Sequence, residues 1–295
     1  VIYKKIIMKN FELFLELTRL KKPIGFMLLF WPCLWGLALA NQFSNNNYIF
    51  LIHCLLFFCG AVLMRSAGCI VNDILDRKID TMVERTKNRP IASGKISVQT
   101  GLIYVFILCL LALIILIQFN KNTIILGLSS MPFAFSYPLM KRFTYWPQLF
   151  LGFTFNYGLI MAWMSLTNEF SFYPLLFYFG AIFWTLGYDT IYGFQDIKDD
   201  EIIGVKSTSI KFKKNPKLFL FLCYLIFYIS IFLTGILMSF NLYYFLFSIL
   251  IFLHLILFQV KPLDVSQGHI CLKKFKSNNF LGLLVFINIL IGDFF

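Results

Sequence analysis

The chain has 295 residues, of which 59% are hydrophobic and only 14% are charged, about half of the charged share of an average soluble domain. This composition excludes an ordinary soluble globule. The formal net charge of +12 would suit nucleic-acid binding, but the basic residues are scattered among the connections between apolar runs, and membrane topology explains that pattern better than a nucleic-acid partner does.

Apolar runs recur from Pro23 to the C-terminus, and each approaches the roughly 20 residues that a membrane-spanning helix needs. Because helices satisfy their own backbone hydrogen bonds in lipid, the runs predict an all-α polytopic membrane protein with about nine transmembrane helices in a bundle. We expect a single integral-membrane domain over residues 1–295 and a basic N-terminal segment, residues 1–22, without a cleavable signal pattern. The predicted spans are 23–41, 48–71, 99–119, 122–140, 147–166, 171–191, 218–238, 241–260 and 278–294.

The basic residues favour one side of these spans. Of the 26 Lys and Arg residues, 24 lie in the N-terminal segment or in the connections after the even-numbered spans. The positive-inside rule then places the N-terminus and these connections in the cytoplasm. Two of them are rich in Asp, at about residues 72–98 and 189–217, so both Asp-rich loops are expected on the same side of the membrane.

The first Asp-rich stretch runs from Asn72 to Pro90. If the preceding helix continues through it, Asn72, Asp76 and Asp80 fall at positions i, i+4 and i+8 and share one face. Clustered oxygen ligands of this kind suit a hard divalent cation, and Mg²⁺ also leaves coordination positions open for phosphate oxygens.

The second stretch repeats the first. Tyr192, Asp196 and Asp200 have the same spacing, and each lies 120 residues after its counterpart. This offset predicts a duplicated four-helix unit whose two sites face each other. Nine of the 14 acidic residues lie in the two stretches, where like charges repel unless cations neutralise them. Two acidic helix faces therefore predict a bridged polyphosphate.

Basic side chains accompany both stretches and can neutralise a phosphate leaving group, although ordinary positive-inside charges in a solvated loop are the alternative. Tyr137 and Lys141, four residues apart at the end of the fourth span, can share a face toward the phosphate or act as an interfacial anchor. The basic residues are Arg77, Lys78, Arg85, Lys87, Arg89, Lys141, Arg142, Lys198 and Lys206.

Two charged residues lie deeper in the predicted spans. Arg65 is seven residues before Asn72, on the same side of its helix, and a charge inside a span is costly enough to favour a functional role. Asp189 is seven residues before Asp196, and its counterpart in the first half is Cys69. Since the repeated metal geometry does not require it, we expect Asp189 to orient the second substrate or accept its proton. Pairing with a basic residue to stabilise the bundle is the alternative.

The spans are also rich in aromatic residues, with 37 Phe in the whole chain. Most of these Phe are expected to face lipid or other helices, but an aromatic groove that includes Trp31, Trp35, Trp163 and Trp184 would suit a polyisoprenoid tail and an allylic cation. A secondary transporter is the competing class. It is disfavoured because the acids lie at the ends of spans rather than near the bilayer midplane.

These residues resemble the UbiA superfamily of intramembrane prenyltransferases. Its first signature, Asn-Asp-x-x-Asp-x-x-x-Asp followed by Arg-Thr-x-x-Arg-Pro, is present as Asn72–Asp80 and Arg85–Pro90. Its second resembles Tyr192–Asp200, followed by Lys206-Ser207-Thr208, with Gly193 where Ala is expected. Within the superfamily the chain is most similar to members that prenylate 4-hydroxybenzoate in ubiquinone synthesis. The segments that carry this similarity are Arg19–Gly25 with Trp31-Pro32, Tyr137–Thr144 with Pro147-Gln148, and Tyr188–Tyr192.

The resemblance implies transfer of a polyprenyl group from polyprenyl diphosphate to the ring carbon ortho to the hydroxyl of 4-hydroxybenzoate, with naphthoate, homogentisate or haem as alternative acceptors. It implies a bacterial or mitochondrial inner-membrane protein with lipid around it and no nucleic-acid partner. The implied Mg²⁺ ligands are Asn72, Asp76, Asp80, Asp196 and Asp200, and the implied diphosphate ligands are Arg77, Tyr137, Lys141 and Arg142. Arg19 or Arg65 would hold the carboxylate of the acceptor, and Asp189 would help remove a proton. Tyr192 and Lys206 complete the substrate-binding set. Prenyl chain length and oligomeric state are not predicted.

Overall fold

The computed structural model describes the backbone of residues 2–44 and 46–294 and the side chains of residues 10–44 and 46–292. The predicted N-terminal segment, residues 1–22, therefore lies partly outside the described side chains. Every regular element in the described chain is helical, which confirms the all-α class. Eight segments of these residues are long and apolar enough to cross a membrane.

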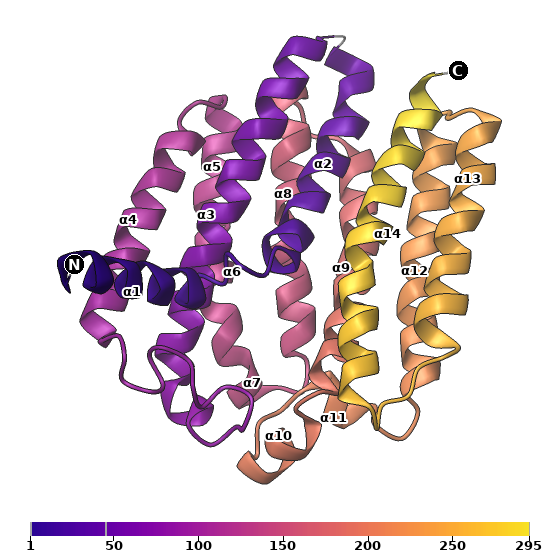
Figure 1. Ribbon diagram of the computed structural model, residues 1–295. Coiled ribbons are helices and arrows are strands. Elements are labelled where there is room, and N and C mark those ends of the chain that lie inside the picture. Colours follow the sequence, from indigo (N-terminus) through magenta and orange to yellow (C-terminus); the bar gives the residue numbers. More distant parts are fainter. Residues whose placement is uncertain (1, 45, 295) are drawn as a thin grey trace.

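The helices follow the predicted spans closely. A ninth helix, α9, has span length and packs against α8 and α12 in the bundle (Figure 1). The bounds are α1 (Ile2–Leu17), α2 (Ile24–Ser44), α3 (Asn47–Asp80), α4 (Val98–Leu116), α5 (Lys121–Ser129), α6 (Met131–Ser136), the 3₁₀-helix η1 (Tyr137–Leu139), α7 (Met140–Phe143), α8 (Pro147–Thr167), α9 (Phe172–Gly193), α10 (Ile197–Ile203), α11 (Thr208–Lys211), α12 (Pro216–Leu237), α13 (Leu242–Leu253), the π-helix η2 (His254–Val260) and α14 (Gly268–Phe294).

Three predicted spans differ from the helices of the structure. The fourth, predicted over 122–140, is broken into α5, α6, η1 and α7, because Pro132 and Pro138 cannot donate backbone hydrogen bonds within a helix. The ninth begins at Gly268 rather than near residue 278, since lysines end a membrane-embedded segment without ending a helix. The eighth span continues from α13 into η2.

The two halves of the chain pack in the same order. In the first half α2 contacts α3 and α3 contacts α4; in the second half α8 contacts α9 and α9 contacts α12, and α2 packs against α8. This order agrees with the predicted duplication. The α2–α8 approach is close, because a Cβ on Gly36 would lie 2.2 Å from the backbone oxygen of Leu159.

Four of the five tryptophans lie in the core and do not line an open groove. Trp35 and Trp184 are fully buried, their rings are 4.9 Å apart, and the indole Nε1 of Trp35 donates to the oxygen of Gly282. Trp31 and Trp163 are also buried. The predicted tryptophan-lined groove for a polyisoprenoid tail is therefore wrong for these four residues, because helix packing and indole hydrogen bonds bury them.

Both Asp-rich stretches lie at one end of the bundle, as predicted. Figure 1 shows the connection after α3 and the short helices α7, α10 and α11 together at that end, while α1 runs crosswise to the other helices. The predicted loop regions are partly helical, since residues 72–80 belong to α3 and residues 189–193 to α9. The fold thus gathers the candidate site from segments far apart in the sequence.

Candidate active site

The first Asp-rich stretch is the last part of α3. The helix runs without interruption from Asn47 to Asp80, which confirms that Asn72, Asp76 and Asp80 share one helical face. Asp73 precedes Asp76 by less than one turn, and Asp73, Asp76 and Asp80 are all buried. Burial of three carboxylates at one helix end requires nearby positive charge.

The second stretch is not one continuous helix. α9 ends at Gly193 and α10 begins at Ile197, so Tyr192, Asp196 and Asp200 do not share a helical face as predicted. Residues 194–196 form a tight turn in which each backbone N–H bonds to the third oxygen before it. Spacing by four residues also fits such a turn, and the helical interpretation was wrong for this half.

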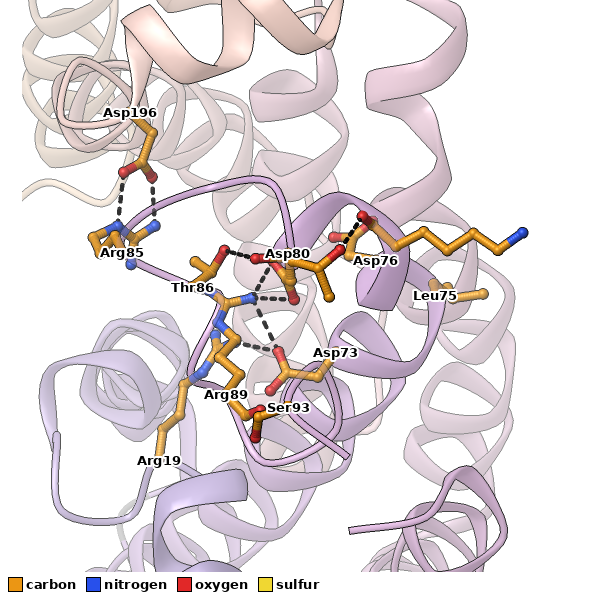
Figure 2. Close-up of polar contacts among 12 residues, drawn as sticks. Arg19, Asp73, Leu75, Asp76, Asp80, Arg85, Thr86, Arg89, Ser93 and Asp196 are labelled. Atoms are coloured by element: carbon orange, nitrogen blue, oxygen red, sulfur yellow. Dashed lines mark hydrogen bonds and ion pairs between the residues drawn. The ribbon is translucent and has the colours of Figure 1, made fainter. Parts of the chain in front are cut away.

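Arginines neutralise the buried carboxylates of α3. The Nη2 of Arg19 lies 2.5 Å from Asp73 Oδ1, and the Nη1 of Arg89 lies 3.1 Å from the same oxygen. Arg89 also donates to both oxygens of Asp80, at 3.0 and 2.9 Å (Figure 2). Arg19 adopts a left-handed backbone conformation, with φ of 57°, which is uncommon for a residue other than glycine.

Lys141 and Arg142 of α7 reach the same end of α3. The Nζ of Lys141 donates to Asp76 Oδ2, and the Nη2 of Arg142 donates to the backbone oxygen of Leu75 at 2.8 Å. Arg142 lies 4.0 Å from Asp76 Oδ1, an oxygen that is buried and accepts no hydrogen bond from the described residues. Asp76 therefore retains a buried acceptor without a hydrogen bond, which a metal ion could occupy.

Arg85 joins the two halves of the site. It belongs to the connection after α3, and its Nε donates to Asp196 Oδ1 at 2.7 Å while its Nη2 donates to Oδ2 (Figure 2). Its Nη1 donates to the hydroxyl of Tyr192 at 3.2 Å. Phe275 of α14 packs on the Tyr192 ring with centroids 4.6 Å apart. The sequence did not predict these contacts of Asp73, Arg85, Arg89 and Phe275. The available signal was the four-residue spacing between Arg85 and Arg89.

Other predicted residues lie around this network. Burial, and then the negative charge of Asp196, raise the pKa of the Asp200 carboxyl to about 6. Lys206 donates from Nζ to the backbone oxygen of Phe143 at 3.2 Å. Arg77 is exposed and lines, with Arg142, a surface depression of about 380 Å³ beside α3. The structure does not bring Arg77 into the ion-paired network.

A second group of polar residues lies deeper. The guanidinium carbon of Arg65 lies 5.2 Å from the centroid of the Phe155 ring, and Tyr137 and Asp189 are within electrostatic range of Arg65. Its Nε is buried without a hydrogen-bond partner. Gly25 leaves room for this side chain, because a Cβ there would lie 2.9 Å from that nitrogen.

The oxygen atoms of this site suit a hard cation, but most of the carboxylates already form ion pairs with Arg and Lys side chains of the same chain. Among the described residues, no three His, Cys, Asp or Glu side chains lie together as a preformed metal site. Asp73, Asp76, Asp80 and Asp196 are instead ion-paired to Arg and Lys. The carboxylate oxygens, together with Asp76 Oδ1, which has no hydrogen-bond partner, fit Mg²⁺ once those pairs open.

Fold and site together define a polytopic α-helical membrane protein with an Asp- and Arg-rich end built to hold a polyanion. The model of the UbiA prenyltransferase family matches residues 29–288, and the chain belongs to this family. It is 42% identical over 284 residues to the mitochondrial 4-hydroxybenzoate polyprenyltransferase of Arabidopsis thaliana, covering 95% of this chain and 68% of that one. It is 38% identical over 281 residues to the 4-hydroxybenzoate octaprenyltransferase of Psychromonas ingrahamii, covering 95% and 96%.

Solved structures share the fold. The apo structure of a UbiA homologue from Aeropyrum pernix K1 has a TM-score of 0.71 at 22% identity, covering 90% of this chain and 96% of that one. A UbiA homologue from Archaeoglobus fulgidus, bound to GPP and Mg²⁺, has a TM-score of 0.66 at 18% identity, covering 94% and 99%. At these identities the likeness concerns the fold alone.

Proposed function

We propose that the chain transfers a polyprenyl group from polyprenyl diphosphate to the ring carbon ortho to the hydroxyl of 4-hydroxybenzoate, releasing diphosphate, in ubiquinone biosynthesis. Relatives that are 38–42% identical over nearly the whole chain carry this activity in their names. The observation that supports it most directly is a half-buried arginine, Arg65, whose Nε has no hydrogen-bond partner and which lies on α3, the helix that carries the first Asp-rich stretch.

The metal in this proposal is Mg²⁺, held by Asn72, Asp76, Asp80, Asp196 and Asp200. When bound, it would neutralise the diphosphate and so make the diphosphate a better leaving group. Mg²⁺ accompanies prenyl diphosphates in the crystals of the Archaeoglobus homologue. In this chain the free Oδ1 of Asp76 supports the choice.

The diphosphate is held by basic side chains that already surround the acids. Lys141 and Arg142 contact Asp76 or its neighbour from α7, and Arg77 lies across the depression from Arg142. Tyr137 lies on the deeper side, within electrostatic range of Arg65. As the C1–O bond breaks, negative charge develops on the diphosphate, and these donors stabilise it.

Arg65 is the better of the two candidates for the carboxylate of 4-hydroxybenzoate. Arg19 already pairs with Asp73 at 2.5 Å, whereas the guanidinium of Arg65 lies over the Phe155 ring and its Nε has no hydrogen-bond partner. A guanidinium within a membrane-spanning helix is costly without a counter-ion. The carboxylate of the acceptor would supply that charge, and a bidentate contact would orient the ring.

Asp189 is the residue that we assign to the removal of the ring proton. The electron pair of the ring carbon ortho to the hydroxyl attacks C1 of the allylic cation, and the same ring carbon then loses its proton to restore the aromatic ring. Asp189 lies on α9 within electrostatic range of Arg65, so a ring held by Arg65 would lie near it. Asp189 thus accepts the proton or orients the ring.

The protein is an integral membrane protein, and we propose the bacterial or mitochondrial inner membrane as its location. The named relatives include mitochondrial and bacterial proteins. The bias of Lys and Arg toward one set of connections supports a cytoplasmic or matrix position for the Asp-rich end.

Acceptor-dependent release of diphosphate tests the proposal. The chain, reconstituted in bilayers with geranyl diphosphate and Mg²⁺, should release diphosphate with 4-hydroxybenzoate but not with homogentisate or a naphthoate. Thermal unfolding of the same sample shows that the protein is folded. Equal rates with all acceptors, or no rate with any, would contradict the proposal.

A further inference from the structure

Both carboxylate oxygens of Asp196 are taken by one side chain. Arg85 donates from Nε to Oδ1 at 2.7 Å and from Nη2 to Oδ2, the bidentate geometry that makes arginine–carboxylate pairs strong. Each oxygen keeps a further lone pair, but the guanidinium charge beside the carboxylate repels an approaching cation. Asp196 is therefore held in a form that disfavours a cation until Arg85 leaves.

This pair is more exposed than the pairs that Arg89 and Lys141 make with the acids of α3. The Arg85 side chain is 41% exposed, while those of Arg89 and Lys141 are 19% and 23% exposed. Arg85 also comes from the connection between α3 and α4, which lacks regular helix, whereas Lys141 is fixed in α7. The Arg85–Asp196 pair can thus open without disturbing a packed helix.

Tyr192 would keep a released guanidinium in place. The Arg85 guanidinium carbon lies 5.6 Å from the centroid of the Tyr192 ring, and Nη1 donates to the Tyr192 hydroxyl at 3.2 Å. Phe275 packs against the same ring. Arg85 therefore retains a contact beside the site when its bond to Asp196 is broken.

We propose that Arg85 is a positioning residue that holds Asp196 in the metal-free protein, gives it up to a divalent cation, and then turns its guanidinium to the diphosphate. The inference rests on the metal ligands of the proposed function. It implies that Arg85 opposes metal binding in the absence of diphosphate and couples the two ligands when both are present. Because coupling is reciprocal, diphosphate should strengthen metal binding through Arg85.

The test measures Mn²⁺ binding to the full chain in bilayers, from the electron paramagnetic resonance signal of free Mn²⁺. Removing a partly exposed bidentate pair in Arg85→Gln should tighten Mn²⁺ binding about threefold to tenfold. Lys87→Gln is the matched control. It removes the same charge from the same connection, where Lys87 pairs with the exposed Glu84, and should leave the Mn²⁺ affinity within a factor of about two. Arg85→Lys should lie between wild type and Arg85→Gln.

A second titration adds inorganic diphosphate. The wild-type protein should gain Mn²⁺ affinity on adding it, and Arg85→Gln should gain less. The inference would be overturned if Arg85→Gln bound Mn²⁺ no more tightly than wild type, or if Lys87→Gln tightened Mn²⁺ binding as much as Arg85→Gln does. The absence of measurable Mn²⁺ binding in every variant would also overturn it. Since neither titration contains a prenyl group or an acceptor, a failure of the proposed prenylation would leave this result standing, and the reverse also holds.

Discussion

Replacing Arg65 by Gln tests the acceptor site most specifically. Gln is shorter than Arg and keeps a polar amide, but it loses the positive charge that we assign to the carboxylate of 4-hydroxybenzoate. A hydrogen bond to a charged group contributes about 1.5–3 kcal/mol, which corresponds to roughly a tenfold to hundredfold change in affinity. The KM for 4-hydroxybenzoate should therefore rise by about that factor, while the KM for the prenyl diphosphate changes little.

Steady-state rates with two acceptors measure the acceptor preference of wild type and of Arg65→Gln. 4-Hydroxybenzamide has the same ring and hydroxyl but no carboxylate, so wild type should strongly prefer 4-hydroxybenzoate and Arg65→Gln should lose most of that preference. Arg19→Gln is the companion variant, because Arg19 pairs with Asp73 and should not affect the choice of acceptor. A wild-type KM and preference in Arg65→Gln would refute the assignment.

Three further predictions follow from the geometry. Gly25→Ala places a Cβ 2.9 Å from Arg65 Nε and should raise the KM for 4-hydroxybenzoate without lowering the yield of folded protein; an unchanged KM would count against Arg65. Gly36→Ala meets the backbone of Leu159, whereas Gly60→Ala on α3 meets nothing within 4 Å. Thermal unfolding should therefore show a loss of about 1–3 kcal/mol for Gly36→Ala alone, and equal stability of the two variants would contradict the close packing of α2 on α8. Asp196→Asn should raise the Mg²⁺ concentration that gives half the maximal rate by at least roughly tenfold to hundredfold, which is what the loss of a partner that only supports a metal ligand costs. Undiminished activity at limiting Mg²⁺ would remove Asp196 from the metal site.

The bundle was predictable from the sequence because every segment that crosses the lipid must be an apolar helix of about 20 residues. Apolar length alone located the helices, and the even spacing of Asn72, Asp76 and Asp80 correctly indicated that α3 continues to Asp80. The break in the fourth span was also signalled, by Pro132 and Pro138, although the hydropathy pattern concealed it. The early start of α14 was missed because lysines were interpreted as the end of a helix.

The ion pairs of the site were not predictable in the same way. Arg19, Arg85 and Arg89 are brought to their carboxylates by packing between segments far apart in the chain, and no local pattern specifies such partners. The turn at residues 194–196 was missed because a four-residue spacing fits both a helix and a turn followed by a helix. The burial of Trp35 and Trp184 likewise depends on which helices meet, which composition does not reveal.

The identity of the product tests the central claim most directly. Bilayers containing the chain, Mg²⁺, geranyl diphosphate and 4-hydroxybenzoate are extracted, and the product is examined by mass spectrometry and proton NMR. We expect one geranyl group on the ring carbon ortho to the hydroxyl, with one diphosphate released for each product. Folded protein that yields no such product, or that prenylates the hydroxyl or a different acceptor, would contradict the account.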